Sequence, residues 1–329
     1  MRKNIRVKIV LLMALSVACL WGNAWAVEGG KSLYLLGKRG PVAGLIPKPG
    51  WYVTNDLYYY DGDSNQEFPI AGLLNKGITA EAHVNVLQAT WITDTRLGNG
   101  RLAIGGVVPY GHVRIKADAT ASTPGGTTLA GGVSDSLTDV GDPALAASLG
   151  WRKRDGDLFR AWSIYSTVFI PVGAYKEGRL ANMGANRWGL DVGTAFTFGN
   201  FKKGREFSGV LGITFNGEND DTDYDSGNEA HIELTYKQHL PSGFSAGLVG
   251  YYSRQFTSDS GGPKILGDFK SRVGGIGPEM AYQFKAAGRS MGLDLRWYHE
   301  FDAKNRVEGD AVFLTFSVPL QPDPPPAKK

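Results

Sequence analysis

A serine and a histidine in the second half of the chain come closest to a catalytic pair. The stretch GFSAG at 243–247 matches the G-x-S-x-G pattern that surrounds the nucleophilic serine of many hydrolases. If the turn before it joins two paired strands, His239 and Ser245 lie opposite each other and would support acyl transfer. The hydrolase pattern belongs to a strand–turn–helix, whereas Gly243 opens a strand, and no third catalytic member is evident. We therefore expect no catalytic residues and no enzyme, with a weak Ser/His hydrolase activity as the alternative.

An acidic stretch at 217–228 is the second group of residues with possible chemistry. Clustered carboxylates of this kind suit calcium, which prefers oxygen ligands. The stretch departs from the EF-hand pattern, because Ser226 stands at the glycine position and Ile232 at the position of the bidentate glutamate. We interpret it as a solvated connection, with weak calcium binding as the alternative, and expect no metal site and no cofactor. The carboxylates are those of Glu218, Asp220, Asp221, Asp223 and Asp225.

Apolar residues recur at every second position in several segments. In HIELTYKQHL (231–240), one set of alternate residues is almost entirely ionisable and the other is mostly apolar. Because a strand shows alternate side chains to opposite faces, this pattern predicts a sheet with one apolar and one ionisable face. The same period of two is found at 187–198, 291–298 and 311–318. The candidate site residues on the ionisable face are Arg187, Asp191, His231, Glu233, Lys237, His239, Tyr251, Glu279, Asp294 and Arg296.

Strand-like segments fill the chain from residue 51 onward, with almost no helical period. The connections between them alternate between long and short. Short turns at one end and long loops at the other are typical of a transmembrane barrel, whereas a soluble sandwich has no reason to separate them. The predicted strands are 51–60, 79–93, 101–117, 143–154, 159–171, 187–199, 207–216, 229–240, 244–257, 273–284, 290–302 and 310–319.

We therefore predict an all-β fold, a transmembrane antiparallel β-barrel of about 12 strands over residues 51–320. Its apolar face would meet the lipid of a bacterial outer membrane, and its ionisable face would line a lumen. Aromatic residues near the strand ends suit the two interfacial girdles of such a barrel. The alternative is a large soluble all-β protein that buries its apolar faces against each other.

Residues 1–26 have the features of a cleaved signal peptide: a basic start, a short apolar stretch and the small-residue site Ala24-Trp25-Ala26. Cleavage would remove four basic residues and no acidic one, so the formal charge would fall from +3 to −1. The apparent basicity is thus a property of the signal peptide, and we expect no nucleic-acid partner. The only cysteine, Cys19, would leave with it, so the mature chain cannot be a disulfide scaffold.

Several stretches of the chain are similar to one known family. They are GPVAGLIPKPGWY (40–52), GDPALAASLGWR (141–152), NMGANRW (182–188), FNGENDDTDYDSGNE (215–229) and GGIGPEMAYQF (274–284). Together they resemble the meta-pathway phenol-degradation transporter-like family of outer-membrane proteins. The resemblance implies a channel for passive uptake of small hydrophobic or aromatic compounds. A barrel with a structural role is the alternative, and the oligomeric state is left open.

The predicted lumen carries charges of both signs, which argues against a strongly ion-selective pore. Two interpretations of these charges remain open. They would orient a solute in transit, or they would form a self-neutralising network that braces the barrel. Apolar and aromatic lumen positions that would supply affinity are Val210, Val249, Tyr251 and Phe313.

The Gly- and Pro-rich stretch at 27–50 precedes the first predicted strand, so we expect it to start on the periplasmic side. Its apolar residues, including Leu35, Leu36 and Ile46, favour burial, which suggests a plug that folds into the lumen. The alternative is a loose periplasmic leader. At the other end, 321–329 is predicted to be a Pro-rich disordered tail.

Overall fold

The period of two in the sequence is realised as long strands throughout the chain. A computed structural model describes residues 31–66, 68–70, 73–122, 128–258, 260–261 and 270–323. Within these residues, no helix is long and apolar enough to span a membrane. The predicted signal peptide (1–26), the start of the stretch at 27–50 and the end of the predicted tail fall outside the described residues. The strands of the main sheet are β1 (Gly50–Ser64), β3 (Leu73–Leu97), β4 (Gly100–Ser122), β6 (Ala144–Asp155), β7 (Leu158–Phe169), β8 (Gly189–Asn200), β9 (Arg205–Asn216), β12 (Glu229–His239), β13 (Phe244–Gln255), β15 (Arg272–Ala286), β16 (Arg289–Lys304) and β17 (Glu308–Pro319).

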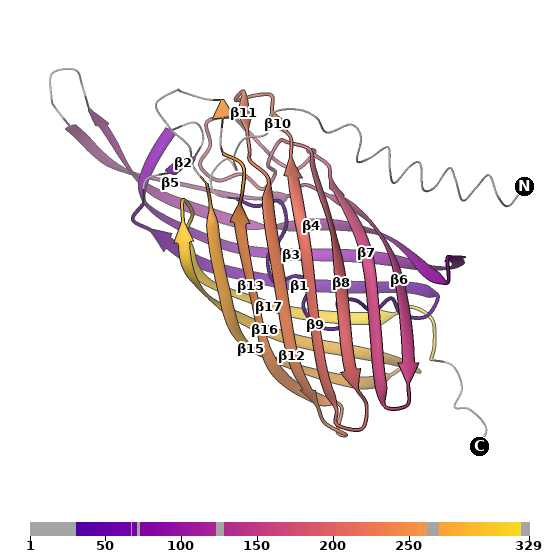
Figure 1. Cartoon of the computed structure of the whole chain (residues 1–329). Helices are drawn as coiled ribbons and strands as arrows, with labels where there is room; N and C mark the ends of the chain where they lie inside the picture. Colours follow the sequence, from indigo (N-terminus) through magenta and orange to yellow (C-terminus); the bar gives the residue numbers. More distant parts are fainter. Residues whose placement is uncertain are drawn as a thin grey trace, which may run out of the picture.

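These strands close into an antiparallel barrel of 12 strands (Figure 1). Each strand pairs with the next one in the order above, and β17 returns to pair with β1 from Tyr52↔Pro319 to Asp63↔Glu308. Closure leaves the barrel without an open sheet edge, so every strand satisfies its backbone groups on both sides. The predicted all-β fold and its antiparallel barrel are confirmed.

Further strands also form inside the connections that were predicted to be loops. They are β2 (Phe68–Ile70), β5 (Thr128–Val140), β10 (Glu218–Asn219), β11 (Tyr224–Asp225) and β14 (Ser260–Gly261). The last three form a small separate sheet over the acidic stretch. The segment 118–142 was wrongly expected to be only a connection, because its Gly, Ala, Ser and Thr residues show no apolar alternation.

β5 pairs with the C-terminal half of β4 instead of joining the barrel. The pairing runs from Tyr110↔Val140 to Ser122↔Thr128, whereas the N-terminal half of β4 pairs with β6 as far as Val107↔Ala144. The resulting hairpin projects beyond the end of the barrel that carries the long connections (Figure 1). We call this the long-connection end, and the opposite one the short-turn end.

The outward face of the barrel is apolar and the inward face is buried. In β12, Leu234 and Tyr236 are 40% and 47% exposed, whereas Glu233 and Thr235, which alternate with them, are nearly fully buried. Such an exterior cannot meet water at low cost but suits the hydrocarbon of a bilayer. Paired tryptophans stack near the short-turn end, with ring centroids 6.2 Å apart in both Trp51–Trp91 and Trp151–Trp162. A closed barrel with this exterior is an outer-membrane protein, as predicted.

Candidate functional site

The N-terminal segment (residues 31–49) lies along the inward face of the barrel from one end to the other. At the long-connection end, Lys31 Nζ donates to the carbonyl of Met183 at 2.7 Å, and Arg187 donates to the carbonyl of Lys31 at 3.0 Å. At the short-turn end, Arg101 Nη1 donates to the carbonyl of Pro47 at 2.7 Å. The chain therefore enters the lumen at the end opposite to the predicted one, and reaches β1 only after passing through the barrel.

Glu233 of β12 joins the barrel wall to the N-terminal segment near the middle of the lumen. Its Oε1 accepts hydrogen bonds from the Tyr34 hydroxyl at 2.8 Å and from the Gly37 backbone nitrogen at 3.0 Å. Gly37 has φ of +81°, and a Cβ there would lie 2.8 Å from the Tyr298 ring. A glycine is therefore required for the segment to turn at this point.

Farther toward the short-turn end, the segment lies directly against the wall. Lys38 forms an ion pair of 2.5 Å with Asp56 of β1, and the Val42 nitrogen donates to Glu206 of β9 at 2.7 Å. The Gly44 nitrogen donates to the Thr197 hydroxyl at 3.1 Å. A Cβ on Gly44 would lie 2.6 Å from the Cα of Phe196, so the backbone here approaches the wall more closely than any side chain allows.

Four of the predicted site residues form one charged network in the middle of the lumen. Lys237 of β12 pairs with Glu279 of β15 and lies 3.4 Å from Asp294 of β16. Arg296 Nε is 2.8 Å from the other oxygen of Asp294. Arg296 also donates to the carbonyl of Lys38 at 3.0 Å, so the network holds the N-terminal segment as well as the wall.

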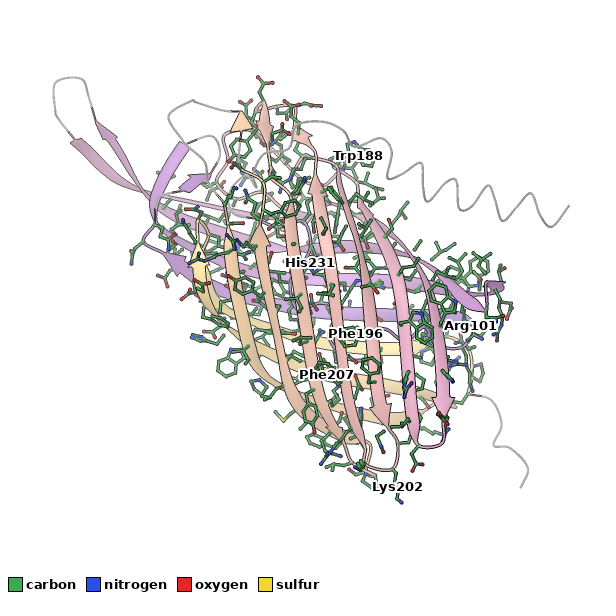
Figure 2. All side chains as sticks on the ribbon, viewed as in Figure 1. Arg101, Trp188, Phe196, Lys202, Phe207 and His231 are labelled. Atoms are coloured by element: carbon green, nitrogen blue, oxygen red, sulfur yellow. The ribbon has the colours of Figure 1, made fainter. Side chains whose placement is uncertain are left out.

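Asp191 of β8 and His231 of β12 form a second, separate group. The His231 ring nitrogen Nε2 lies 2.8 Å from Asp191 Oδ2, which also accepts a hydrogen bond from the Thr214 hydroxyl at 2.8 Å. Both side chains are fully buried, and Tyr34 stacks on the His231 ring. His231 lies between the two ends of the barrel, with Trp188 toward the long-connection end (Figure 2).

The other predicted site residues lie apart from these two groups. Arg187 is at the long-connection end, and the Tyr251 hydroxyl donates to Glu300 at 2.8 Å. His239, near the short-turn end, lies 2.8 Å from Glu206 and opposite Ser245 in the strand register. No hydrogen bond joins His239 and Ser245, both of which are among the described residues, so the structure does not assemble them into a nucleophile and its base.

Several lumen residues were missed in the sequence, chiefly Asp56 and Glu206, which anchor the N-terminal segment. Asp56 lies next to Leu57, which is 50% exposed on the outer face, so the period of two places Asp56 inward. Glu206 was missed because the predicted strand, 207–216, began two residues later than β9 does.

An aromatic and apolar cluster occupies the lumen beside the charged network. It combines two residues of the N-terminal segment with residues from β1, β13, β15, β16 and β17, and Tyr58 packs against it. Three of the four positions expected to supply affinity belong to it, whereas Val210 packs with Tyr165 and Ala195 instead. Its buried members are Tyr34, Leu36, Tyr60, Val249, Tyr251, Val273, Tyr298, Ala311 and Phe313.

The acidic stretch does not assemble into a metal-binding group. Across the described residues, no cluster of three or more His, Cys, Asp or Glu side chains could hold a metal ion. Glu218 and Asp225 lie opposite each other in the β10–β11 pair.

Comparisons with known proteins agree with this architecture. A family model described as "Putative MetA-pathway of phenol degradation" matches residues 54–316. No curated protein matches the chain. Among solved structures, an outer membrane channel from Pseudomonas putida F1 superimposes with a TM-score of 0.64 at 15% identity, covering 84% of this chain and 98% of the other.

Two further solved structures match with lower scores. The β domain of the Bordetella autotransporter BrkA has a TM-score of 0.43 at 11% identity, covering 83% of this chain and 100% of the other. The Pseudomonas aeruginosa protein OpdK, crystallised with vanillate, has a TM-score of 0.33 at 10% identity, covering 82% and 98%. The first structure is therefore the one that supports the barrel fold.

Proposed function

We propose, from the premise that this chain belongs to the MetA-pathway of phenol degradation family, that it is an outer-membrane channel for small hydrophobic or aromatic molecules. The observation that carries the proposal is the aromatic cluster inside the lumen. A lumen that serves only water and ions has no need of buried Tyr251, Tyr298 and Phe313. Aromatic rings pack favourably against one another, so these side chains offer affinity to a ring-bearing solute.

The N-terminal segment acts as the gate in this proposal. It contributes Tyr34 and Leu36 to the same cluster, so its withdrawal would leave an aromatic surface open to a solute. Hydrogen bonds that the segment donates to Glu233, Glu206 and Thr197 of the wall hold it in the closed position. Movement of the solute is passive and follows its own gradient.

The charged side chains of the lumen serve two roles in this proposal. Lys237, Glu279, Asp294 and Arg296 neutralise one another while the gate is closed. Arg296 gives up its bonds to Gly37 and Lys38 when the segment leaves, which frees donors for the polar group of a solute. The network thus orients a solute whose ring lies on the aromatic cluster.

The test is permeability of proteoliposomes that contain the refolded mature protein. Uptake of phenol or benzoate is compared with that of a sugar of similar size, after correction for protein-free leakage. The proposal expects faster uptake of the aromatic compound and exclusion of the sugar. Equal rates would indicate a general porin, and no protein-dependent flux of either compound would contradict a channel.

A deletion of residues 27–47 tests the gate separately. A segment that closes the lumen predicts that single-channel conductance rises when it is removed. If the wall side chains close the lumen by themselves, the deletion leaves conductance unchanged. Phe313→Ala, introduced into the protein that lacks residues 27–47, then tests the aromatic surface. The expected result is slower uptake of the aromatic compound.

A further inference from the structure

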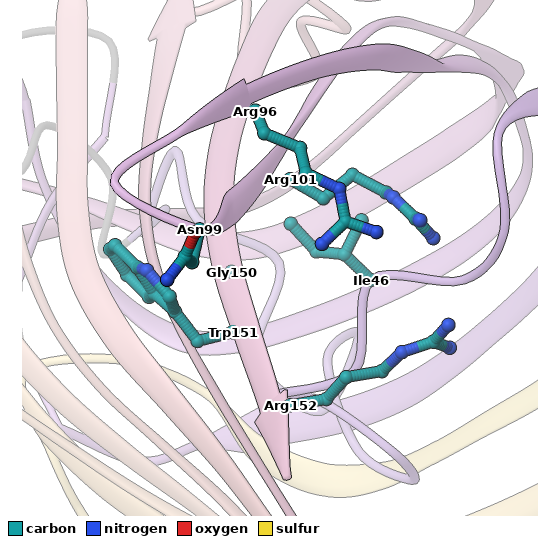
Figure 3. A pocket seen from close by; sticks show the side chains of 7 residues that line it. All are labelled: Ile46, Arg96, Asn99, Arg101, Gly150, Trp151 and Arg152. Atoms are coloured by element: carbon teal, nitrogen blue, oxygen red, sulfur yellow. The ribbon is translucent and has the colours of Figure 1, made fainter.

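A small cavity at the short-turn end brings three arginines together. It has a volume of about 120 Å³ and lies where the β3–β4 turn, β6 and the N-terminal segment meet (Figure 3). Figure 3 shows Ile46 between Arg96 and Arg101 on one side and Arg152 on the other. The remaining lining residues are Asn99, Gly150 and Trp151.

The strand register explains why the three arginines converge. Arg96 of β3 pairs with Arg101 of β4 across the two-residue turn, and Arg101 pairs with Gly150 of β6. Arg152 lies two residues beyond Gly150, and therefore on the same inward face. The turn itself is held by the Trp151 indole nitrogen, which donates to the carbonyl of Gly98 at 2.9 Å.

These arginines have no acidic partner among the described residues, unlike three other cations of the lumen. Lys38, Lys237 and Arg296 each lie within ion-pair distance of a carboxylate. Arg101 instead donates to the carbonyl of Pro47. Neither Arg96 nor Arg152 makes a side-chain hydrogen bond or ion pair with any residue that the structure describes.

Three guanidinium groups without acidic partners repel each other around one cavity, and an anion between them would offset this repulsion. Asp94 acts on Arg101 through space but forms no ion pair with it. The planar guanidinium group presents parallel N–H donors that match the two oxygens of a carboxylate or phosphate. The volume of the cavity is large enough for a carboxylate or phosphate group.

We propose that Arg96, Arg101 and Arg152 form an oxyanion-binding site at the short-turn mouth of the barrel, for the carboxylate or phosphate group of a small molecule. Ile46 offers an apolar contact to the remainder of the ligand. Arg101 belongs to the site and also donates a hydrogen bond to Pro47 of the N-terminal segment. The oxyanion has two possible sources. It is the acidic group of a solute that leaves the lumen, or the phosphate of a lipid in the adjacent leaflet, near the Trp151–Trp162 pair.

Calorimetric titration of the folded protein in a nonionic detergent tests the site. The probes are benzoate, inorganic phosphate and a short-chain phosphatidylglycerol, with benzyl alcohol as the neutral counterpart of benzoate. The double variant Arg96→Gln/Arg152→Gln removes two of the three charges and no described hydrogen bond. Lys202→Gln is the matched control, because Lys202 is exposed at the same end of the barrel but away from Arg101 (Figure 2).

The expected result is saturable binding of at least one oxyanion, weakened roughly tenfold or more in the double variant. Lys202→Gln and the benzyl alcohol titration should show no such change. Tighter binding of benzoate than of phosphate and lipid assigns the site to a solute, and tighter binding of the lipid assigns it to a head group. Arg152→Gln alone should give a smaller loss of affinity. This single variant replaces the double variant in the test if the double variant does not fold.

Two results would overturn the proposal. One is the absence of saturable binding for all three oxyanions. The other is an equal loss of affinity in Lys202→Gln, which would show attraction to the general surface charge. Binding at the mouth requires no passage through the barrel, so a failure of the transport test leaves this site standing.

Discussion

Tyr34 stacks on His231 with ring centroids 3.8 Å apart and ring planes 18° apart. One ring belongs to the N-terminal segment and the other to the barrel wall. The contact buries both rings and brings the Tyr34 hydroxyl to Glu233. One set of interactions therefore holds the N-terminal segment in place and gives the buried Glu233 carboxylate a hydrogen bond.

Replacement of Tyr34 by alanine should loosen the N-terminal segment while the barrel stays folded. Loss of a buried aromatic ring costs about 3–5 kcal/mol in a packed interior. Amide hydrogens of residues 31–49 should then exchange on the order of 100-fold faster or more, since exchange follows local opening. Tyr34→Phe keeps the stacking and loses only the hydrogen bond, so its effect should be smaller. Unchanged exchange in Tyr34→Ala would show that the stacking does not hold the segment.

Gly44 should be the position in the segment least tolerant of a side chain. A Cβ there would lie 2.6 Å from backbone atoms of Phe196, which cannot move without disturbing β8. Gly44→Ala should therefore raise the single-channel conductance by displacing the segment. Gly40→Ala is the control, because its Cβ would meet the Thr235 hydroxyl at 3.3 Å, a contact that a side chain can relieve. Equal conductance in the two variants would argue against close packing at Gly44.

Lys237 should be needed for the stability of the barrel as well as for its electrostatics. Lys237→Met leaves the buried Glu279 without its cation, and breaking a buried pair costs about 3–5 kcal/mol. The loss should appear as a lower free energy of unfolding in urea. Lys237→Met/Glu279→Gln removes both charges and should recover part of the stability. A double variant as unstable as the single one would show that the charge pair is not the cause.

The contact between Asp135 and Arg179 should make the long-connection end sensitive to acid. Hydrogen bonding by Arg179 lowers the pKa of Asp135 from 3.8 to about 2, and the Ala181 backbone adds to the shift. A carboxyl with a lowered pKa in the folded state stabilises that state above its unfolded pKa, and the stabilisation is lost as the pH falls from about 4 to about 2. Cleavage of the 171–188 connection by pepsin should increase over this range relative to Asp135→Asn, which lacks the ionisable group. A constant ratio between the two proteins would contradict the assignment.

The sequence by itself determined the barrel, because a strand's faces depend only on neighbouring residues. Glu233 and Leu234 must point to opposite sides wherever the strand lies, so lipid and lumen faces could be assigned before any pairing was known. The alternation of long and short connections is equally local, and it specified an antiparallel arrangement. For the same reason, the ten candidate site residues could be chosen from the inward positions of their own strands.

Only the tertiary structure decided which of these residues meet. Asp191 and His231 are both predictable as inward residues, yet their contact crosses β9 and depends on how the barrel twists and closes. The path of the N-terminal segment was beyond local reasoning as well, since its contacts join residues such as Gly44 and Thr197, 153 positions apart. In the sequence, Gly44 is one of several glycines in a Gly- and Pro-rich stretch. Only the structure shows that a glycine is required at this position, because the backbone of the segment closely approaches that of β8. Local periodicity thus sets which face a side chain occupies, whereas closure of the barrel sets its partner.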